Sequence, residues 1–181
     1  MSYSPAPILR PDLGQINVLS PEALDIRAAR NVSLGTPAAI TWVANLAVFV
    51  PFGISVPFTV LEVWWYNGSG AGGNIDVGVY DTTGAKIFTL GTTAKGTVSV
   101  PVTSSGMTDV VLAPGDYYMA FATDNATATN AFGWAPAAPL AAGLGCGQMS
   151  TAFVLPTSAT IVPLTNALLP HFGLNGYSVA P

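Results

Sequence analysis

Over most of the chain, apolar and polar side chains alternate in short segments that end at Gly, Pro, Asn or Asp. In the stretch NIDVGVYDTTGAKIFTLG (74–91), Ile75, Val77 and Val79 alternate with other residue types, a turn signal follows, and a second alternation begins. A period of two is that of a strand with one face on a core, and such segments separated by turns predict hairpins. Because no helical period is interleaved, we expect an all-β fold, an antiparallel β-sandwich of the jelly-roll or Greek-key kind.

The alternation predicts a long series of short strands. They are expected near residues 41–51, 57–66, 74–81, 85–91, 96–102, 107–113, 116–123, 130–135, 147–155, 159–164 and 170–178. In the first hairpin, Ile75, Val77 and Val79 should face the core.

The predicted strand 57–66 contains one acid, Glu62, whose charge should point to solvent. Alternation then places Trp64 and Tyr66 on the same outward face. The opposite face is expected to lie in the core and comprises Leu61, Val63 and Trp65.

The stretch LAPGDY (112–117) has the spacing of a tyrosine corner, in which a Tyr near a strand start returns its hydroxyl to upstream backbone. Tyr117, Met119 and Phe121 would then face the core, and Tyr118 would lie on the other face of that strand.

Charged residues are sparse in this chain. Of its 181 residues only 8% are charged and 50% are hydrophobic, whereas about 25% of residues are charged in ordinary soluble domains. The length fits one domain. With a net charge of −4 and 5 basic residues, the chain is not expected to bind nucleic acid or anionic membranes. Prolines interrupt the longest apolar stretch, 40–65, so we expect no membrane span. The uncharged surface indicates an assembly, and we expect a homo-oligomer.

Residues 1–39 differ from the rest and are predicted to form an N-terminal extended arm that docks on another subunit. Pro residues punctuate this segment, and it holds Arg10, Arg27 and Arg30. The pattern Ser-Pro-Glu at its middle predicts one short helix over 21–30. Residues 40–181 are predicted to form the sandwich domain. No signal-peptide pattern is present, so we expect no export by that route.

Few residues of this chain could carry out chemistry. His171 is the single histidine, and no nucleophile elbow accompanies it. Cys146 is the single cysteine, which excludes an intrachain disulfide. No spacing suits zinc or calcium ligands. We therefore predict no enzyme, no cofactor and no metal.

The remaining candidates are contact residues. If their strands are neighbours, Glu62 and Asp76 could share a face with Trp64, forming either a sugar-binding patch or an ordinary solvated strand face. The aromatic residues could stack on sugar rings or on a protein neighbour, or could belong to the core or to a subunit interface. They are Trp42, Trp64, Trp134, Tyr66 and Tyr118.

The order of several segments is informative beyond their individual patterns. These are AVFVPF, VPFTVLEVWWYNG, NIDVGVYDTTGAKIFTLG, GTVSVPV and LAPGDYYMAFATDN, with PHFG near the C-terminus. In this order they resemble the β-sandwich of tailed-bacteriophage tail-fibre and other virion proteins, in which P-F-T-V, N-x-D-V-G-[IV]-Y-D and L-x-P-G-x-Y-Y recur. The resemblance covers residues 41–176.

The resemblance implies a non-enzymatic component of the virion, commonly trimeric, exposed on the particle and sometimes bound to host-surface glycans. The expected partners are therefore other virion proteins and further copies of the chain. No fibre shaft, coiled-coil heptads or collagen-like repeats precede the sandwich here. This departure favours an adaptor or capsid decoration protein over a free-standing fibre. A carbohydrate-binding module for host glycans is the alternative function.

Overall fold

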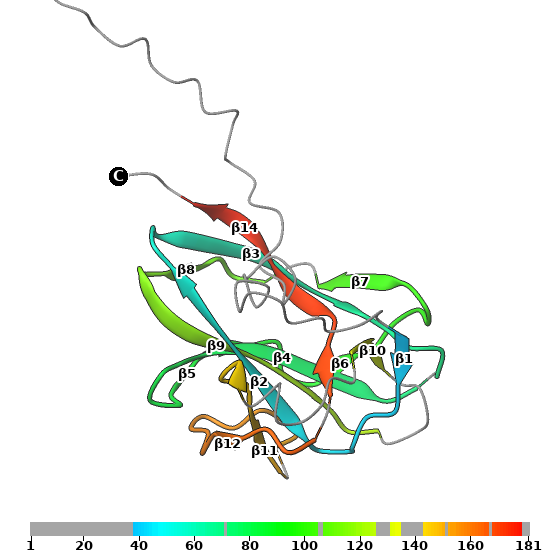
Figure 1. Ribbon diagram of the computed structural model, residues 1–181. Coiled ribbons are helices and arrows are strands. Elements are labelled where there is room, and N and C mark those ends of the chain that lie inside the picture. Colours follow the sequence, from blue (N-terminus) through cyan, green and yellow to red (C-terminus); the bar gives the residue numbers. More distant parts are fainter. Residues whose placement is uncertain are drawn as a thin grey trace, which may run out of the picture.

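The computed structural model confirms an all-β fold of antiparallel sheets arranged as a sandwich (Figure 1). It describes residues 38–70, 72–104, 107–125, 131–134, 143–150, 152–166 and 168–178. The predicted helix over 21–30 and the rest of the arm before residue 38 lie outside the described residues.

Two large sheets and one small sheet make up the fold. The seven-stranded sheet contains, in spatial order, β12 (Val162–Pro163), β11 (Gly147–Met149), β2 (Ala47–Ile54), β9 (Gly115–Thr123), β4 (Asn74–Asp81) and β5 (Lys86–Thr89), with β6 (Thr93–Ala94) also paired to β4. The four-stranded sheet contains β14 (Phe172–Ser178), β3 (Phe58–Tyr66) and β7 (Pro101–Ser104), with β8 (Val110–Leu112) also paired to β3. The small sheet contains β1 (Ala38–Ile40), β10 (Ala131–Trp134) and β13 (Leu169–Pro170).

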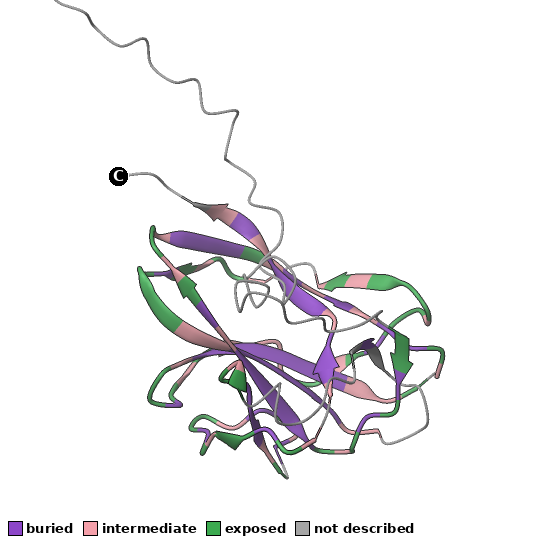
Figure 2. Cartoon of the chain, in the orientation of Figure 1, coloured by how far each residue is buried: buried purple, intermediate pink, exposed green. Residues whose placement is uncertain are grey.

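The main core lies between the two large sheets. As predicted, Ile75, Val77 and Val79 of β4 belong to it, together with Met119 and Phe121 of β9. The period of two explains this directly, because alternate side chains of each strand point to the same side of the sheet. The strands β2, β4 and β9 are largely buried, and exposure increases toward the ends and edges of the sheets (Figure 2).

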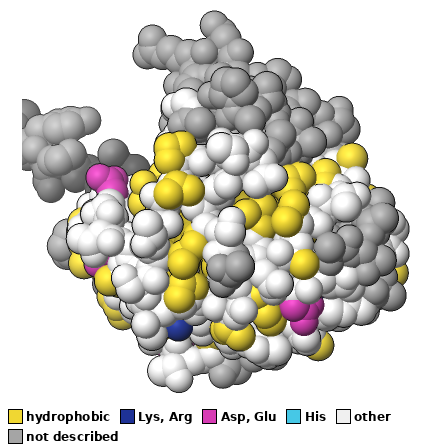
Figure 3. Space-filling view, turned by 90° about the horizontal axis from the view of Figure 1, so that it is seen from below, with side chains coloured by type: hydrophobic (Ala, Val, Ile, Leu, Met, Phe, Trp, Pro, Cys, Tyr) yellow, Lys and Arg dark blue, Asp and Glu magenta, His cyan; other side chains and the backbone are white. Residues whose placement is uncertain are grey.

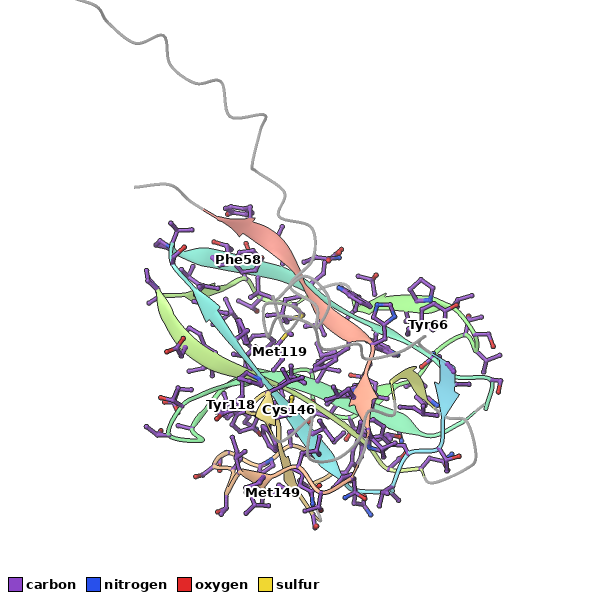
Figure 4. The ribbon with its side chains drawn as sticks, viewed as in Figure 1. Phe58, Tyr66, Tyr118, Met119, Cys146 and Met149 are labelled. Atoms are coloured by element: carbon purple, nitrogen blue, oxygen red, sulfur yellow. The ribbon has the colours of Figure 1, made fainter. Side chains whose placement is uncertain are left out.

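The tyrosine corner is also confirmed. The hydroxyl of Tyr117 donates a hydrogen bond of 2.8 Å to the backbone oxygen of Ala113, four residues upstream. Tyr117 packs against the main core, as expected. Tyr118 lies on the other side of β9, toward Met149, whereas Met119 lies between the two sheets (Figure 4).

The outer face of the seven-stranded sheet is covered by the chain's own segment between β11 and β12, from 152 to 161. A second apolar cluster forms there, in which Phe49 and Tyr80 of the sheet meet Ala152, Leu155 and Ala159 of the covering segment. Because of this cover, β4 is buried on both faces rather than on one.

The strands predicted at 147–155 and 159–164 are much shorter than expected. Only β11 and β12 form, and the backbone between them is held by other groups of the sheet and its turns. The amide of Ala152 donates to the oxygen of Asn45 at 2.8 Å, and the amide of Ala159 donates to the oxygen of Gly84 at 2.8 Å. The hydroxyl of Tyr80 donates to the oxygen of Pro156 at 2.6 Å. These bonds take the place of a strand ladder. The alternation of side chains in the sequence does not reveal which of the two kinds of backbone bonding a segment has.

The predicted core position of Leu61 is wrong, because β3 contains a β-bulge. Along β14, Asn175 pairs with Glu62 and the next residue pairs with Val60, so Leu61 is an extra residue in β3. An extra residue reverses the faces of a strand. Val60 therefore faces the core before the bulge and Val63 faces it afterwards, while Leu61 is 37% exposed.

The boundary predicted between residues 39 and 40 falls inside β1. Ala38 and Ala39, which the sequence pattern assigned to the arm, pair with Gly133 and Phe132 of β10. The sheet structure therefore begins two residues earlier than expected.

Substituting Gly176 tests the packing around the bulge. An added Cβ would overlap the backbone oxygen of Thr59 and lie 2.9 Å from the ring of Phe58. We expect Gly176→Ala to lower the free energy of unfolding by about 1–3 kcal/mol, as overpacking does. Gly143→Ala is the matched control, because its added Cβ has no atom within 4 Å and should change stability by less than about 0.5 kcal/mol. Chemical denaturation measures both, and equal effects would contradict the packing described here.

Candidate functional site

The candidate site is the outer face of the four-stranded sheet, the side turned away from the core. Because Val63 and Trp65 of β3 point into the core, the alternate residues Glu62, Trp64 and Tyr66 point outward, as predicted for these three. His171 lies beside them, since the backbone amide of Tyr66 donates a 2.9 Å hydrogen bond to its carbonyl oxygen.

His171 packs with both outward aromatic rings. Its ring meets Trp64 edge to face, with a centroid distance of 5.0 Å and an interplanar angle of 84°. The same ring lies parallel to that of Tyr66, at 6.0 Å and 6°. The hydroxyl of Tyr66 donates to the oxygen of Ser99 at 2.9 Å, which fixes the tyrosine ring. The three rings thus form a preformed aromatic cluster, with Tyr66 near the end of β3 beside β7 (Figure 4).

Other polar and apolar groups lie along the same sheet. The amide nitrogen of Asn175 donates to a Glu62 carboxylate oxygen at 3.2 Å, so the one acid of the strand is held by its neighbour across the ladder. Val111 of β8 is 65% exposed, and Leu61 at the bulge is also exposed. The sequence did not single out these two apolar residues as contact candidates. The alternation could have identified Val111, because its neighbours on both sides in β8 pack toward the core.

The indole N–H of Trp64 is a shielded hydrogen-bond donor. Its Nε1 atom is shielded from solvent and has no hydrogen-bond partner among the described residues. A buried donor without an acceptor costs about 1–3 kcal/mol.

The interpretation of Trp42 as an exposed contact residue is wrong. Trp42 is 1% exposed and belongs to the main core. Its Nε1 donates to the oxygen of Leu46 at 3.0 Å, and its ring meets Phe121 edge to face at 5.0 Å. Its short-range hydrogen bond satisfies the polar atom of a large ring, which permits complete burial.

Asp76 and Glu62 do not share a face, because the condition that their strands are neighbours is not met. The two acids lie in different sheets, and Asp76 is fully buried under the covering segment. Its carboxylate accepts hydrogen bonds of 2.9 Å from the amides of Gly91 and Leu155. Burial raises the pKa of Asp76, while these two bonds and the nearby Lys86 act in the opposite direction. Asp76 is therefore a structural anchor that ties the cover to the sheet.

For two further sets of predicted contact residues, the side chains lie outside the described part of the chain. Trp134 lies in β10, where its backbone pairs with Leu169, but its side chain lies outside the description. Arg10, Arg27 and Arg30 precede the first described residue.

The glycine-rich tip that begins at Asn67 contacts a buried lysine of another segment, Lys95, that sequence reasoning missed. Lys95 is almost fully buried, and its Nζ donates to the oxygen of Gly70 at 3.5 Å. Its own carbonyl oxygen accepts from the indole of Trp65 at 3.1 Å and from the amide of Asn67. Burial lowers the pKa of Lys95, and the nearby Asp124 opposes that shift. These bonds hold the tip against the sheet, so Lys95 has a structural part in the fold.

The described residues show neither a metal-binding cluster nor a membrane-spanning helix. Among the described residues, no group of three or more His, Cys, Asp or Glu side chains could hold a metal ion. No helix within the described ranges is long and apolar enough to cross a membrane. Comparisons with protein-family models, with curated proteins and with solved structures found no match.

Replacing Asp76 by Asn tests the buried anchor. Burial raises the folded pKa above the ordinary value of 3.8, so the native state holds a proton that the unfolded chain has already released. Stability therefore falls as the pH rises from 3.8 through the folded pKa. We expect Asp76→Asn to remove this fall. It should also lower the free energy of unfolding at neutral pH by about 1–3 kcal/mol, because an amide has a single acceptor atom for two backbone amides.

Urea unfolding between acidic and neutral pH measures this effect, and Asp81→Asn is the matched control. The hydroxyl of Thr83 and the amide of Ala85 lower the pKa of the exposed Asp81, so this group contributes stability that rises with pH. The two substitutions should therefore change the slope of stability against pH in opposite directions. Changes of the same sign would contradict the assignment of Asp76.

Proposed function

We propose that this protein is a non-enzymatic structural component of the virion of a tailed bacteriophage. It acts as a surface-exposed tail-fibre, adaptor or capsid decoration protein, and it assembles as a homotrimer. Its partners are further copies of the chain and other virion proteins. The outer face of the four-stranded sheet is the contact surface of this assembly.

The observation that carries the proposal is that the outer face of one large sheet is covered by the chain and that of the other carries exposed apolar residues. The chain covers the outer face of its seven-stranded sheet with residues 152–161, burying Phe49 and Tyr80. On the four-stranded sheet, Leu61 and Val111 are exposed, and the outer face also carries the half-buried Trp64. Exposed apolar groups on a face that also carries aromatic rings are typical of surfaces that bind other proteins.

The charge distribution supports the same role. Lys, Glu and Asp are depleted in protein interfaces, and this chain has few charged residues altogether. Viewed from below, hydrophobic side chains are scattered among uncharged ones and charged groups are few (Figure 3). A face with so few charged groups suits a protein that is surrounded by neighbours in a particle.

The order of the sequence segments adds a second line of support. The strands that carry the resemblance to virion sandwich proteins include β2, β3, β4 and β9, which form the centre of both large sheets. The resembling segments therefore belong to the framework that presents the outer face.

Placing a charge on the outer face tests the proposal. We expect Val111→Arg to weaken self-association roughly 10- to 100-fold, because a buried guanidinium without a partner opposes contact. Val162→Arg is the matched control, since Val162 is 46% exposed on β12 of the other sheet. Sedimentation velocity across a concentration series measures both. A monomeric parent protein, or equal effects of the two substitutions, would contradict the proposal.

A carbohydrate-binding module is the second candidate function. The observation that favours it is the aromatic cluster of Trp64, Tyr66 and His171, bordered by the hydrogen-bonded pair of Glu62 and Asn175. Aromatic rings beside oriented polar groups are suited to sugar rings, which present apolar faces and hydroxyls.

A glycan array separates this candidate from the first. If the face binds sugars, Trp64→Ala should reduce binding at least about tenfold, since an aromatic ring contributes more than 1.4 kcal/mol at a stacked contact. Val111→Arg should leave glycan binding in place while it disrupts association. The absence of any glycan bound by the parent protein would remove the second candidate.

A further inference from the structure

A groove opens between the two large sheets. The seven-stranded sheet contributes β5 and β6 to its lining, and the four-stranded sheet contributes β7 and β8. The groove has a volume of about 400 Å³, near the lower end of the range in which proteins hold small molecules.

The apolar part of the lining belongs to the main core. Its four side chains pack against the core between the sheets, yet each is only partly buried. They are Phe88, Leu90, Met107 and Val110. Covering apolar surface that is in contact with water is favourable. The groove therefore favours an occupant with an apolar surface of its own.

The polar part of the lining consists of hydroxyl side chains, among them those of Thr93, Ser104 and Thr108. The hydroxyl of Thr93 donates to the backbone oxygen of Gly91 at 3.3 Å, so its oxygen is still able to accept a hydrogen bond. None of the described residues that line the groove is charged. A carboxylate or an ammonium group would lack an opposite charge there, which makes its transfer from water unfavourable. The polar end of an occupant is therefore an uncharged group that forms hydrogen bonds, such as a hydroxyl.

We infer that the groove binds the alkyl chain of an uncharged amphiphile, such as a long-chain alcohol. The alkyl chain covers the core residues that the two sheets leave partly exposed, and the head group bonds to the hydroxyl side chains beside them. This binding site goes beyond the proposed structural role and does not depend on it, because the groove lies between the sheets and not on the outer face of either.

NMR of the methionine methyl groups in the full-length chain tests the inference. Met107 lines the groove, and Met119 lies in the main core. Met149 packs in the second apolar cluster, on the other side of the seven-stranded sheet (Figure 4). We expect 1-octanol to shift the methyl signal of Met107 until the site is saturated, and to leave the signal of Met149 in place.

A series of ligands tests the chemical class of the occupant. From 1-hexanol to 1-octanol, the affinity should rise about two- to fourfold for each added methylene, because each one buries more apolar surface. Octanoate, which also has eight carbons, should bind at least about tenfold more weakly than 1-octanol, since its charge has no partner in the lining. Equal binding of the two would overturn the inference. So would octanol shifts that do not saturate or that are alike for Met107 and Met149.

Two neighbouring residues of β7 provide matched variants. Ser104 lines the groove, whereas Thr103 is exposed and points to the opposite side of the strand. Ser104→Trp should fill the groove and weaken octanol binding at least about tenfold, and Thr103→Trp should leave the binding unchanged. Equal binding by the two folded variants would contradict the position of the site. If Ser104→Trp does not fold, the comparison of 1-octanol with octanoate on the parent protein decides.

The same spectra reveal two other kinds of occupant. A Met107 signal that shifts with protein concentration, and does not respond to octanol, would assign the groove to a second copy of the chain. A response to glucose or maltose without a response to octanol would assign it to a sugar. Either result would overturn the inference, and the test of the outer face by Val111→Arg would be unaffected.

Discussion

Burial of the central strands on both faces organises the whole fold. One side of β4 meets the core between the sheets through Ile75 and Val77, and its other side meets the covering segment through Tyr80. A strand that is covered twice cannot keep a polar group unless that group is bonded, and Asp76 meets this condition with two backbone amides. The covering segment in turn has few ladder partners of its own, so it depends on the sheet for its hydrogen bonds. The cover and the sheet therefore stabilise each other.

The strands that were predicted well are those whose hydrophobic alternation coincides with tight turns. β4 has the predicted bounds, and β9 begins one residue before the prediction and ends where expected, because a turn rich in Gly, Asp or Pro stands at one end of each. The contact of Tyr117 with Ala113 was predictable for a similar reason, since it depends on four consecutive positions. The local sequence is sufficient to predict a strand boundary or a hydrogen bond that depends only on neighbouring positions.

The predictions failed where distant segments decide the outcome. Asp76 looks like a solvated acid on a strand, and only the position of Leu155 makes it a buried acceptor. Tryptophan is common in contact surfaces, but the burial of Trp42 depends on Phe121, which lies far along the chain. The bulge at Leu61 depends on the register of β14, which pairs with β3 from the other end of the sequence. In each case the deciding partner is separated by tens of residues, beyond the range of any period.

The bulge in β3 has a consequence for how this surface can vary. The extra residue shifts the alternation of faces by one position between the two halves of the strand. Thr59 and Trp64 therefore lie on the same side of the sheet although they are an odd number of positions apart. Losing or gaining one residue there would turn the rings of Trp64 and Tyr66 inward and send Val63 and Trp65 out to water. The outer face of the sheet can therefore vary by single substitutions. An insertion or deletion of one residue in β3 would instead exchange its solvent-facing and core-facing sides.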